Sequence, residues 1–333
     1  MNLSAIVLAA AFLSPRAAAE EVKTLRIGFF PNITHAQAIL GVTQGRFQKA
    51  LGATKVENKL FNAGPSLTEA LSAGAIDIGY VGPGPATNFF VRSQGQGIRV
   101  ISGAAANGVV IVARKDAGIK TLADLKGRKL ATPQLGNTQD IAARFYLKDR
   151  FGQKDFSNVL PIPNSEQAGM MLRGQLDASW APEPWGARLV SEAEGVILAE
   201  EKDLWPGKKF CAVVVVTTPE FLAKNPRTVE KFLAEHRALT AELAKDPGSR
   251  ADEVASGISK ISGKQILGSS IKDGLARVLF TTDPLEASMK TMAKWAFELK
   301  HLPEETTLEG LIDPSALKPA KAESKAKPKG KGK

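Results

Sequence analysis

The sequence predicts an α/β fold of two lobes, each an open sheet flanked by helices. From residue 25 onward, short apolar runs typical of strands alternate with segments of helical spacing, a pattern that favours open parallel sheets. A sequence motif made of a helix end, a glycine turn and an apolar run around an aspartate occurs at 70–80 and again at 171–180. The chain of 333 residues is also long enough for about two domains.

The first cycle of elements runs from residue 25 to about residue 104. Period-two alternation or short apolar runs predict strands at 25–30, 55–61, 76–81 and 98–104. Helical spacing between them predicts helices at 35–47, 66–73 and 86–94. Proline and glycine in the connections predict loops at 31–34, 62–66 and 82–85.

The second and third cycles complete the chain. We expect strands at 109–113, 129–132, 159–162 and 176–180, with helices at 119–127, 138–151, 165–173 and 186–193. Loops at 135–139 and 182–185 follow two of these strands. The third cycle begins with a strand at 212–217 and continues with helices at 219–224, 228–244, 247–261 and 284–300.

Charge is unevenly distributed along the chain. The net charge is +10, but seven lysines lie within residues 318–333 beside one acid, Glu323. Such a run is typical of a solvated, disordered tail, and we assign 316–333 to it; contact with an acidic membrane surface is the other reading. The rest of the chain is only mildly basic, so we expect no nucleic-acid partner.

The chain has a single cysteine, Cys211. A disulfide within the chain and a cysteine-based metal site are therefore excluded. Cys211 lies in the apolar run FCAVVVV, which indicates a packed strand residue rather than a nucleophile. We expect no metal and no cofactor.

The first residues are typical of an export signal. An apolar run at 3–13 is too short to span a bilayer and precedes AAAE, a cleavage pattern at 17–20. We therefore predict a signal peptide at 1–19 and an exported, soluble protein. No Lys or Arg precedes the apolar run, so either the signal is atypical or the start codon lies elsewhere.

The stretch 130–140, LATPQLGNTQD, has the order of a strand, a turn and a helix start. Asn137 and Thr138 are candidate N-caps for the following helix. The N-terminus of a helix exposes unpaired N–H donors and a partial positive charge, which suits an anion. An ordinary helix cap without a ligand is the alternative.

Several motifs together resemble the periplasmic substrate-binding proteins of ABC importers, in the group for alkanesulfonates, nitrate and taurine. They are LRIGFFPNITHA (25–36), FNAGPS (61–66), IDIGYVGPGPA (76–86), KTLADLKGRKLATPQLGNT (120–138), LDASWAPEPW (176–185) and FTTDP (280–284). The resemblance covers residues 22–315 and rests on the order and spacing of these motifs.

The resemblance implies a two-lobed periplasmic binding protein of type II, the "Venus flytrap" fold. The first lobe would be 22–106 plus 212–315 and the second 107–211, with hinge segments at 107–110 and 210–213. Such a protein, expected to be a monomer, captures a small organic anion, most plainly an aliphatic sulfonate, and delivers it to a membrane permease. Taurine, nitrate, bicarbonate or a thiamine-pyrimidine precursor are alternative ligands, and a periplasmic ligand sensor is an alternative role.

Candidate ligand contacts lie in the loops after the strands, where ligands of open α/β sheets bind. They are Asn32, Thr34, His35, Gly64, Pro65, Ser66, Gly82, Pro83, Gly84, Asn137, Thr138, Gln139, Glu183 and Trp185. Glycine permits a close approach of the backbone to a ligand, and the polar residues supply donors.

Some of these candidates have a second, structural reading. We expect Ser66 to cap its helix, with Glu69 at capping-box distance, and to face Thr138 across the cleft. His35 is the only histidine in a predicted site loop, the others being His236 and His301.

Glu183 either binds the amino group of a zwitterion such as taurine or pairs with an arginine such as Arg188. Trp180 and Trp185 either line an apolar wall for the organic tail or pack in the core.

An enzyme is the competing class of function. No Ser-His-Asp spacing, HExxH, P-loop or GxGxxG motif is present, and GPGP is a poor phosphate loop because proline has no N–H. A related group with this fold makes thiamine pyrimidine with a cysteine-rich motif, which one cysteine cannot supply. We therefore expect a binding protein that is not an enzyme.

Overall fold

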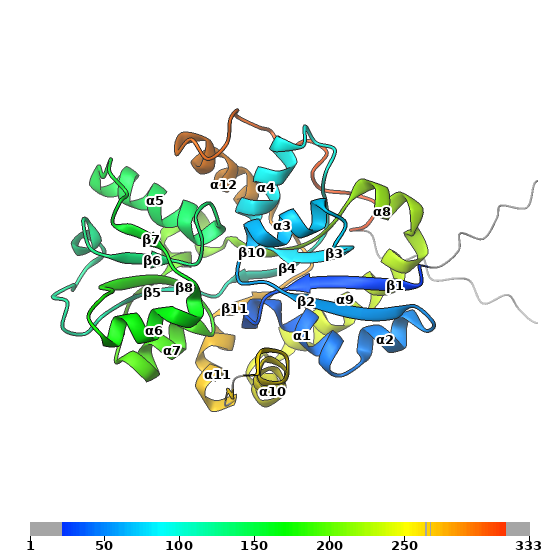
Figure 1. Ribbon diagram of the computed structural model, residues 1–333, viewed down its shortest axis with the longest axis horizontal. Helices are drawn as coiled ribbons and strands as arrows, with labels where there is room; N and C mark the ends of the chain where they lie inside the picture. Colours follow the sequence, from blue (N-terminus) through cyan, green and yellow to red (C-terminus); the bar gives the residue numbers. More distant parts are fainter. Residues whose placement is uncertain (1–21, 264, 267, 318–333) are drawn as a thin grey trace, which may run out of the picture.

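The computed structural model describes residues 22–263, 265–266 and 268–317, which form two sheets flanked by helices (Figure 1). The predicted signal peptide and most of the lysine-rich tail lie outside these residues. Figure 1 shows the second sheet, in green, on the left, and the first sheet, in blue and cyan, on the right. No helix in the described ranges is long and apolar enough to cross a membrane.

The first sheet has six strands in the order β11-β4-β10-β3-β1-β2, and the second has five in the order β7-β6-β8-β5-β9. The strands of the first sheet are β1 (Thr24–Phe29), β2 (Lys55–Leu60), β3 (Ile78–Val81), β4 (Arg99–Asn107), β10 (Cys211–Thr217) and β11 (Val278–Phe280). Those of the second are β5 (Val109–Ala113), β6 (Leu130–Thr132), β7 (Val159–Pro161), β8 (Ala178–Pro182) and β9 (Val196–Glu200).

Helices cover the faces of both sheets. The α-helices are α1 (Ala36–Thr43), α2 (Arg46–Leu51), α3 (Gly64–Ser72), α4 (Pro83–Arg92), α5 (Thr138–Phe151), α6 (Asn164–Leu172), α7 (Trp185–Ala193), α8 (Pro219–Lys224), α9 (Pro226–Lys245), α10 (Ala251–Ser262), α11 (Gly268–Ala276) and α12 (Glu286–Glu298). Short 3₁₀ helices are η1 (Ile33–His35), η2 (Leu122–Leu125), η3 (Glu201–Leu204), η4 (Pro206–Lys208) and η5 (Gly248–Arg250).

The two-lobed α/β architecture is confirmed, but the expectation of parallel sheets is wrong in part. Strand β10 pairs antiparallel with both β3 and β4, and β11 also pairs antiparallel with β4. In the second sheet, β5 runs antiparallel to β8 and β9. All residues of β10 are buried, as expected for a central strand covered on both faces, and Cys211 is among them.

Several other elements differ from the predicted ones for local reasons. The helix expected at 35–47 is divided into α1 and α2 because Gly45 adopts a left-handed conformation with φ of 69°. The helix expected at 119–127 is only the short η2. Strands β9 and β11 and helix α11 were not expected; each is short or weakly periodic.

The motif repeated at 70–80 and 171–180 places an equivalent aspartate beside each sheet. Asp77, before β3, accepts hydrogen bonds from the backbone N–H and the guanidinium of Arg26 on β1. Asp177, before β8, accepts from the Lys129 N–H and the guanidinium of Arg114. Both carboxylates therefore join neighbouring strands at corresponding positions.

Two segments connect the sheets, and they lie side by side. Strand β4 ends at Asn107 and β5 begins at Val109, while the second crossing leads from η4 into β10. The Asn107 N–H donates to the Phe210 carbonyl at 3.1 Å, and the Phe210 N–H donates to Asn107 Oδ1 at 3.2 Å. Lobe boundaries and a hinge at these crossings remain our proposal.

Candidate functional site

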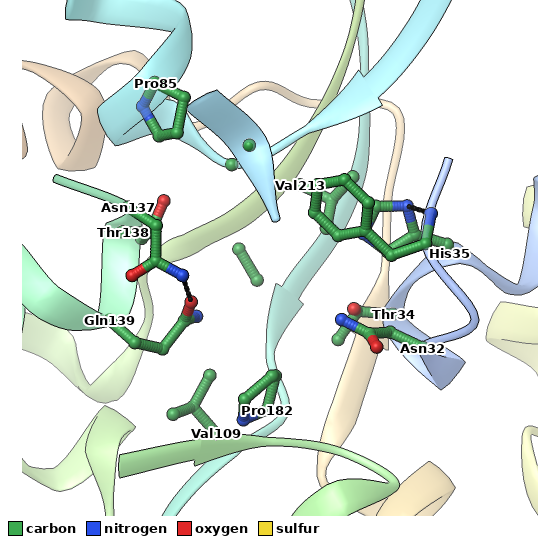
Figure 2. A pocket seen from close by; sticks show the side chains of 14 residues that line it. Asn32, Thr34, His35, Pro85, Val109, Asn137, Thr138, Gln139, Pro182 and Val213 are labelled. Carbon is green, nitrogen blue, oxygen red and sulfur yellow. Dashed lines mark hydrogen bonds between the residues drawn. The ribbon is translucent and has the colours of Figure 1, made fainter. Parts of the chain in front are cut away.

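A small cavity lies between the two sheets, and most of its polar lining comes from the predicted site loops (Figure 2). Its volume is about 20 Å³, which is room for one or two water molecules. Figure 2 shows Asn137 and Gln139 on one side and Thr34 and His35 on the other. The lining residues are Phe30, Asn32, Thr34, His35, Gly64, Gly82, Pro85, Val109, Asn137, Thr138, Gln139, Pro182, Ala212 and Val213.

Three α-helices direct their N-terminal ends at this cavity. Gly64 is the first residue of α3, Gly82 is the N-cap of α4, and Asn137 is the N-cap of α5. Helix N-termini carry a partial positive charge, and their first N–H groups lack partners within the helix. The cavity is therefore surrounded by a field that favours an anion, although the prolines at the start of α3 and α4 remove some backbone donors.

Asp140 holds the loop before α5 in place. Its carboxylate accepts hydrogen bonds from Thr132 Oγ1 and the Gly136 N–H, each at 2.9 Å, and from Arg144 Nε at 2.8 Å. Asn137 caps the helix, as predicted, by accepting from the Asp140 N–H at 2.8 Å. Asp140 is fully buried, so these contacts fix the backbone that presents Asn137, Thr138 and Gln139.

Several polar side chains of the cavity each accept a hydrogen bond from the protein itself. Asn32 Oδ1 accepts from Trp185 Nε1 at 2.7 Å, and Gln139 Oε1 accepts from Asn137 Nδ2 at 3.2 Å. Thr138 Oγ1 accepts from the Gly84 N–H at 3.3 Å. These hydrogen bonds orient the side chains, and the Asn32 and Gln139 amide N–H groups and the Thr138 O–H remain as donors for a ligand.

His35 is a neutral donor of the same kind. Its Nδ1 accepts from the Phe30 N–H at 3.4 Å, which leaves the ring proton on Nε2. Complete burial lowers the pKa of His35 to about 3, so the imidazole is uncharged at neutral pH. The cavity thus offers a second side-chain donor group from the first sheet without a cation.

No described residue that lines the cavity carries a formal charge. Glu183 lies outside the lining, where its buried carboxylate accepts from Arg277 Nη1 at 2.8 Å and from the Ala187 N–H at 2.9 Å. Burial raises the pKa of Glu183, and these contacts oppose the shift. A structural pairing with an arginine was one of the two expectations for Glu183, and the partner is Arg277 rather than Arg188, which is paired with Glu192 one helical turn away.

The two sides of the cavity touch each other at the start of α4. A Cβ built on Gly82 would lie 2.2 Å from Thr138 Oγ1, and one built on Gly84 would lie 3.3 Å from the Thr138 backbone. A side chain at either position would displace Thr138, so the close approach of the two lobes here depends on glycine; an approach of this backbone to a ligand stays a prediction. The lobes are therefore closed on each other in this conformation.

Eight of the predicted contacts come together in the cavity: Asn32, Thr34, His35, Gly64, Gly82, Asn137, Thr138 and Gln139. Pro83 is the buried first residue of α4, and Gly84 contributes only its N–H to Thr138. Pro65 lines a separate groove, and Trp185 lines another cavity. That these residues bind a ligand stays a prediction.

The expectations for Ser66 are wrong. Helix α3 begins at Gly64 with Ala63 as its N-cap, because proline at the second position is compatible with a first helical turn. Ser66 Oγ donates to the Ala63 carbonyl at 3.0 Å, and Ser66 is not among the residues that line the cavity with Thr138.

The sequence reasoning missed several apolar lining residues, among them Val109, Ala212 and Val213. They belong to the two crossings between the sheets, and a crossing must pass the base of any cleft between two lobes. That topological signal could have found them. Trp180, weighed as a lining residue, is buried and donates its Nε1–H to Glu201.

Nothing in the described ranges resembles a metal centre, since no group of three or more His, Cys, Asp or Glu side chains lies close enough to hold an ion. The buried Cys211 thiol has its pKa raised by desolvation. Cys211 is therefore a protonated thiol at neutral pH and supplies no thiolate nucleophile.

Comparisons with known proteins show which families and structures this chain resembles. The model of the NMT1-like family matches residues 18–259. A candidate binding protein of Brucella abortus is 27% identical over 233 residues, which is 69% of this chain and 70% of the relative. The alkanesulfonate-binding protein of Xanthomonas axonopodis pv. citri, solved with bound MOPS, superposes with a TM-score of 0.73 at 20% identity, covering 89% of this chain and 99% of that one.

A second solved structure shares the fold. The periplasmic nitrate-binding protein of Synechocystis superposes with a TM-score of 0.76 at 15% identity, covering 90% of this chain and 88% of that one. At these identities the superpositions establish the two-lobed fold of periplasmic binding proteins.

Proposed function

The chain belongs to the NMT1-like family, and on that basis we propose that it is the exported substrate-binding component of an ABC importer and captures an organic sulfonate between its lobes. In this proposal the closed form delivers the ligand to a membrane permease. The relative with bound MOPS, itself described as an alkanesulfonate-binding protein, supports this ligand class.

The observation that carries the proposal is the set of uncharged hydrogen-bond donors that the cavity keeps for a ligand. Asn32, Thr138, Gln139 and His35 each commit an acceptor atom to the protein and keep a donor for the ligand. A sulfonate oxygen only accepts hydrogen bonds, and its charge does not depend on pH in the physiological range. The helix N-termini supply the complementary positive field without a cation.

The absence of formal charge on the described lining residues supports a monoanion over a dianion. A dianion such as sulfate would keep a larger uncompensated charge after leaving water, which is costly in a neutral site. Binding rather than catalysis is supported by the neutral His35, the inert Cys211 and the pairing of Glu183 with Arg277.

Nitrate is a second candidate ligand. The cavity of about 20 Å³ is small, which favours a compact monoanion, and the nitrate-binding relative has the same fold.

A thermal-shift panel tests the proposal with alkanesulfonates, nitrate, sulfate, taurine, bicarbonate and thiamine pyrimidine. A ligand at a hundred times its Kd stabilises the folded state by about 2.7 kcal/mol, which corresponds to a rise in Tm of about 5 °C for a protein of this size. We expect the alkanesulfonates to produce this shift. A response to nitrate alone favours the second candidate, and a response only to the pyrimidine or bicarbonate excludes both.

A further inference from the structure

A cavity of about 170 Å³ lies outside the cleft, between α5, α12 and the segment from η3 to η4 that precedes β10. We call it the aromatic cavity, because five aromatic side chains line it: Phe145, Tyr146, Trp180, Trp205 and Trp295. We propose that the aromatic cavity binds a small organic cation of the quaternary ammonium class, with the Glu201 carboxylate as its counter-charge. The inference goes beyond the proposed function and does not depend on it, since no residue that lines the aromatic cavity also lines the cavity between the sheets.

Glu201 gives the aromatic cavity an unpaired negative group. Its side chain lines the cavity and is fully buried. The two carboxylate oxygens accept hydrogen bonds from neutral donors, Trp180 Nε1 at 2.6 Å and Trp205 Nε1 at 3.0 Å. Glu201 has no ion-pair partner among the described residues, although a buried acid usually has one. Desolvation raises the pKa of Glu201 to about 7, and a cation bound beside it would stabilise the ionised form.

The other charged residues that line the aromatic cavity neutralise each other. Asp149 and Arg150 are both exposed, and Arg150 Nε lies 3.4 Å from Asp149 Oδ2. The remaining lining residues are uncharged, so the ionised Glu201 sets the net charge of the lining. The cavity reaches the surface at the exposed side chains of Asp149, Arg150 and Pro206. The first two lie in the last turn of α5, where the partial negative charge of a helix C-terminus also favours a cation.

The aromatic lining favours an organic cation over a metal ion. Aromatic rings attract cations through their negative faces, and indole rings do so most strongly. A metal ion needs several oxygen, nitrogen or sulfur ligands, and a single carboxylate among rings does not supply them. A quaternary ammonium ion has no N–H group that requires an acceptor, so ring surface and one carboxylate are sufficient for it. An apolar cavity of about 150 Å³ holds a benzene molecule, so 170 Å³ accommodates an ion of choline size.

The aromatic cavity joins both lobes beside one of the crossings between them. Trp295 belongs to α12, which packs against β10, and Phe145 belongs to α5, which packs against β6 and β8. The centroid of the Trp295 ring lies 4.5 Å from that of Phe145 and 4.3 Å from that of Trp205. Trp205 in turn stacks on Phe210, immediately before β10, at 5.2 Å. A cation in this cavity would therefore contact both lobes and the crossing at once, and its binding would favour the closed conformation.

The matched ligands for the test are choline and 3,3-dimethylbutan-1-ol, which have the same shape and differ in a charged nitrogen against a carbon. Three of the four tryptophans of the chain line the aromatic cavity, so the tryptophan fluorescence of the full chain reports binding. Isothermal titration calorimetry then gives the affinities. We expect choline to bind about tenfold or more tightly than the alcohol. Equal affinities of the matched pair, or no binding of choline, would overturn the inference.

Glu201→Gln tests the role of the carboxylate. The variant keeps a side-chain oxygen of similar position for the indole N–H groups and removes the charge. The affinity for choline should fall about tenfold or more, to that of the alcohol, whereas the affinity for the alcohol should stay unchanged. Circular dichroism and thermal unfolding check that the variant is folded. Unchanged choline affinity in the folded variant would place the cation elsewhere and overturn the inference.

A second variant alters the exposed edge of the aromatic cavity and leaves the buried carboxylate in place. Asp149→Lys replaces the pair with Arg150 by two cations, so choline affinity should fall about threefold or more and the affinity for the alcohol should change little. Glu230→Lys, at an exposed acid of α9 outside the lining, makes the same change in net charge and is the matched control, in which both affinities should be unchanged. Equal choline affinities of the two variants would overturn the inference. The titrations need no ligand in the cleft, so their failure is distinct from a failure of the sulfonate proposal in the thermal-shift panel.

Discussion

The Glu183 carboxylate and the Arg277 guanidinium meet at 2.8 Å and connect the end of β8 with the α11–β11 junction of the other lobe. Glu183 is fully buried and Arg277 is mostly buried. Two neighbouring contacts act in parallel: the Ile33 N–H donates to the Glu183 carbonyl at 3.1 Å, and Trp185 Nε1 donates to Asn32. The segment after β8 is thus a principal attachment between the lobes in the closed conformation.

Arg277→Met should destabilise the protein by about 3 kcal/mol, because it leaves the Glu183 carboxylate buried without its cation. Urea unfolding measures the change in the free energy of unfolding. The double variant Glu183→Gln with Arg277→Met should recover much of the loss, since no buried charge remains. Arg188→Met removes the half-exposed pair with Glu192 and the contact of the guanidinium with the Trp185 ring but leaves no buried charge unpaired, so as the control it should cost less than about 2 kcal/mol. Equal effects of the two single variants would contradict the structure.

Gly82→Ala should weaken ligand binding at least tenfold, because its Cβ would lie 2.2 Å from Thr138 Oγ1 and hold the lobes apart. The Tm of the free protein should change little, since the open conformation relieves the contact. Gly169→Ala on α6 is the matched control: its Cβ would meet only the flexible end of Arg173, and affinity should not change. Calorimetry with the best sulfonate measures both. Unchanged affinity in Gly82→Ala would mean that binding does not require this approach.

His35 should act as a neutral donor. His35→Ala should weaken sulfonate binding about tenfold or more, as expected for a lost hydrogen bond to an anion, whereas His35→Gln keeps an N–H donor and should lose less. The pKa of His35 is lowered to about 3, so the affinity of the wild-type protein should change less than about twofold between pH 8 and pH 6. A rise in affinity approaching tenfold per pH unit over this range would show that the cationic ring binds.

Glu201 should make stability depend on pH. Its carboxylate is buried against Trp180 Nε1 and Trp205 Nε1, and desolvation raises its pKa from 4.5 to about 7. A carboxyl group whose folded pKa is raised contributes stability that is fully present below the unfolded pKa and is lost as the pH rises through the folded pKa. Between pH 4.5 and pH 7, the contribution of Glu201 to the free energy of unfolding should therefore fall by about 3 kcal/mol.

The comparison of wild type with Glu201→Gln in urea, at several pH values, isolates this effect from other titrating groups. The stability advantage of the wild-type protein over the variant should be largest near pH 4.5 and should shrink toward pH 7. A difference between the two proteins that is independent of pH would show that Glu201 is already ionised at low pH.

Much of the candidate site could be predicted because its signals are local. Asn137 caps α5 through a hydrogen bond to a residue three positions away, and the loop 135–139 is recognisable from its glycine and cap residues and from Pro133 just before it. The expected N-cap at Ser66 was wrong, because Pro65 is favourable in the first turn of a helix and α3 therefore begins two residues earlier, at Gly64.

The antiparallel direction of β10 could not be predicted from its composition. An apolar run such as AVVVV indicates a buried strand, but it is compatible with either direction. The direction depends on where the chain re-enters the first sheet after its excursion through the second. Likewise, the short β11 is a strand because it pairs with β4, and its three residues carry no periodicity of their own.

The sequence by itself determined most of the strands and helices, the two-lobed α/β class and most of the loops that surround the cleft, because periodicity, turns and caps depend on neighbouring residues. Only the tertiary structure decided that Glu183 pairs with Arg277, 94 positions away, rather than with Arg188, five positions away. It also decided which atoms of Asn32, His35 and Gln139 remain for a ligand, because their acceptors are occupied by groups that only folding brings within hydrogen-bond distance.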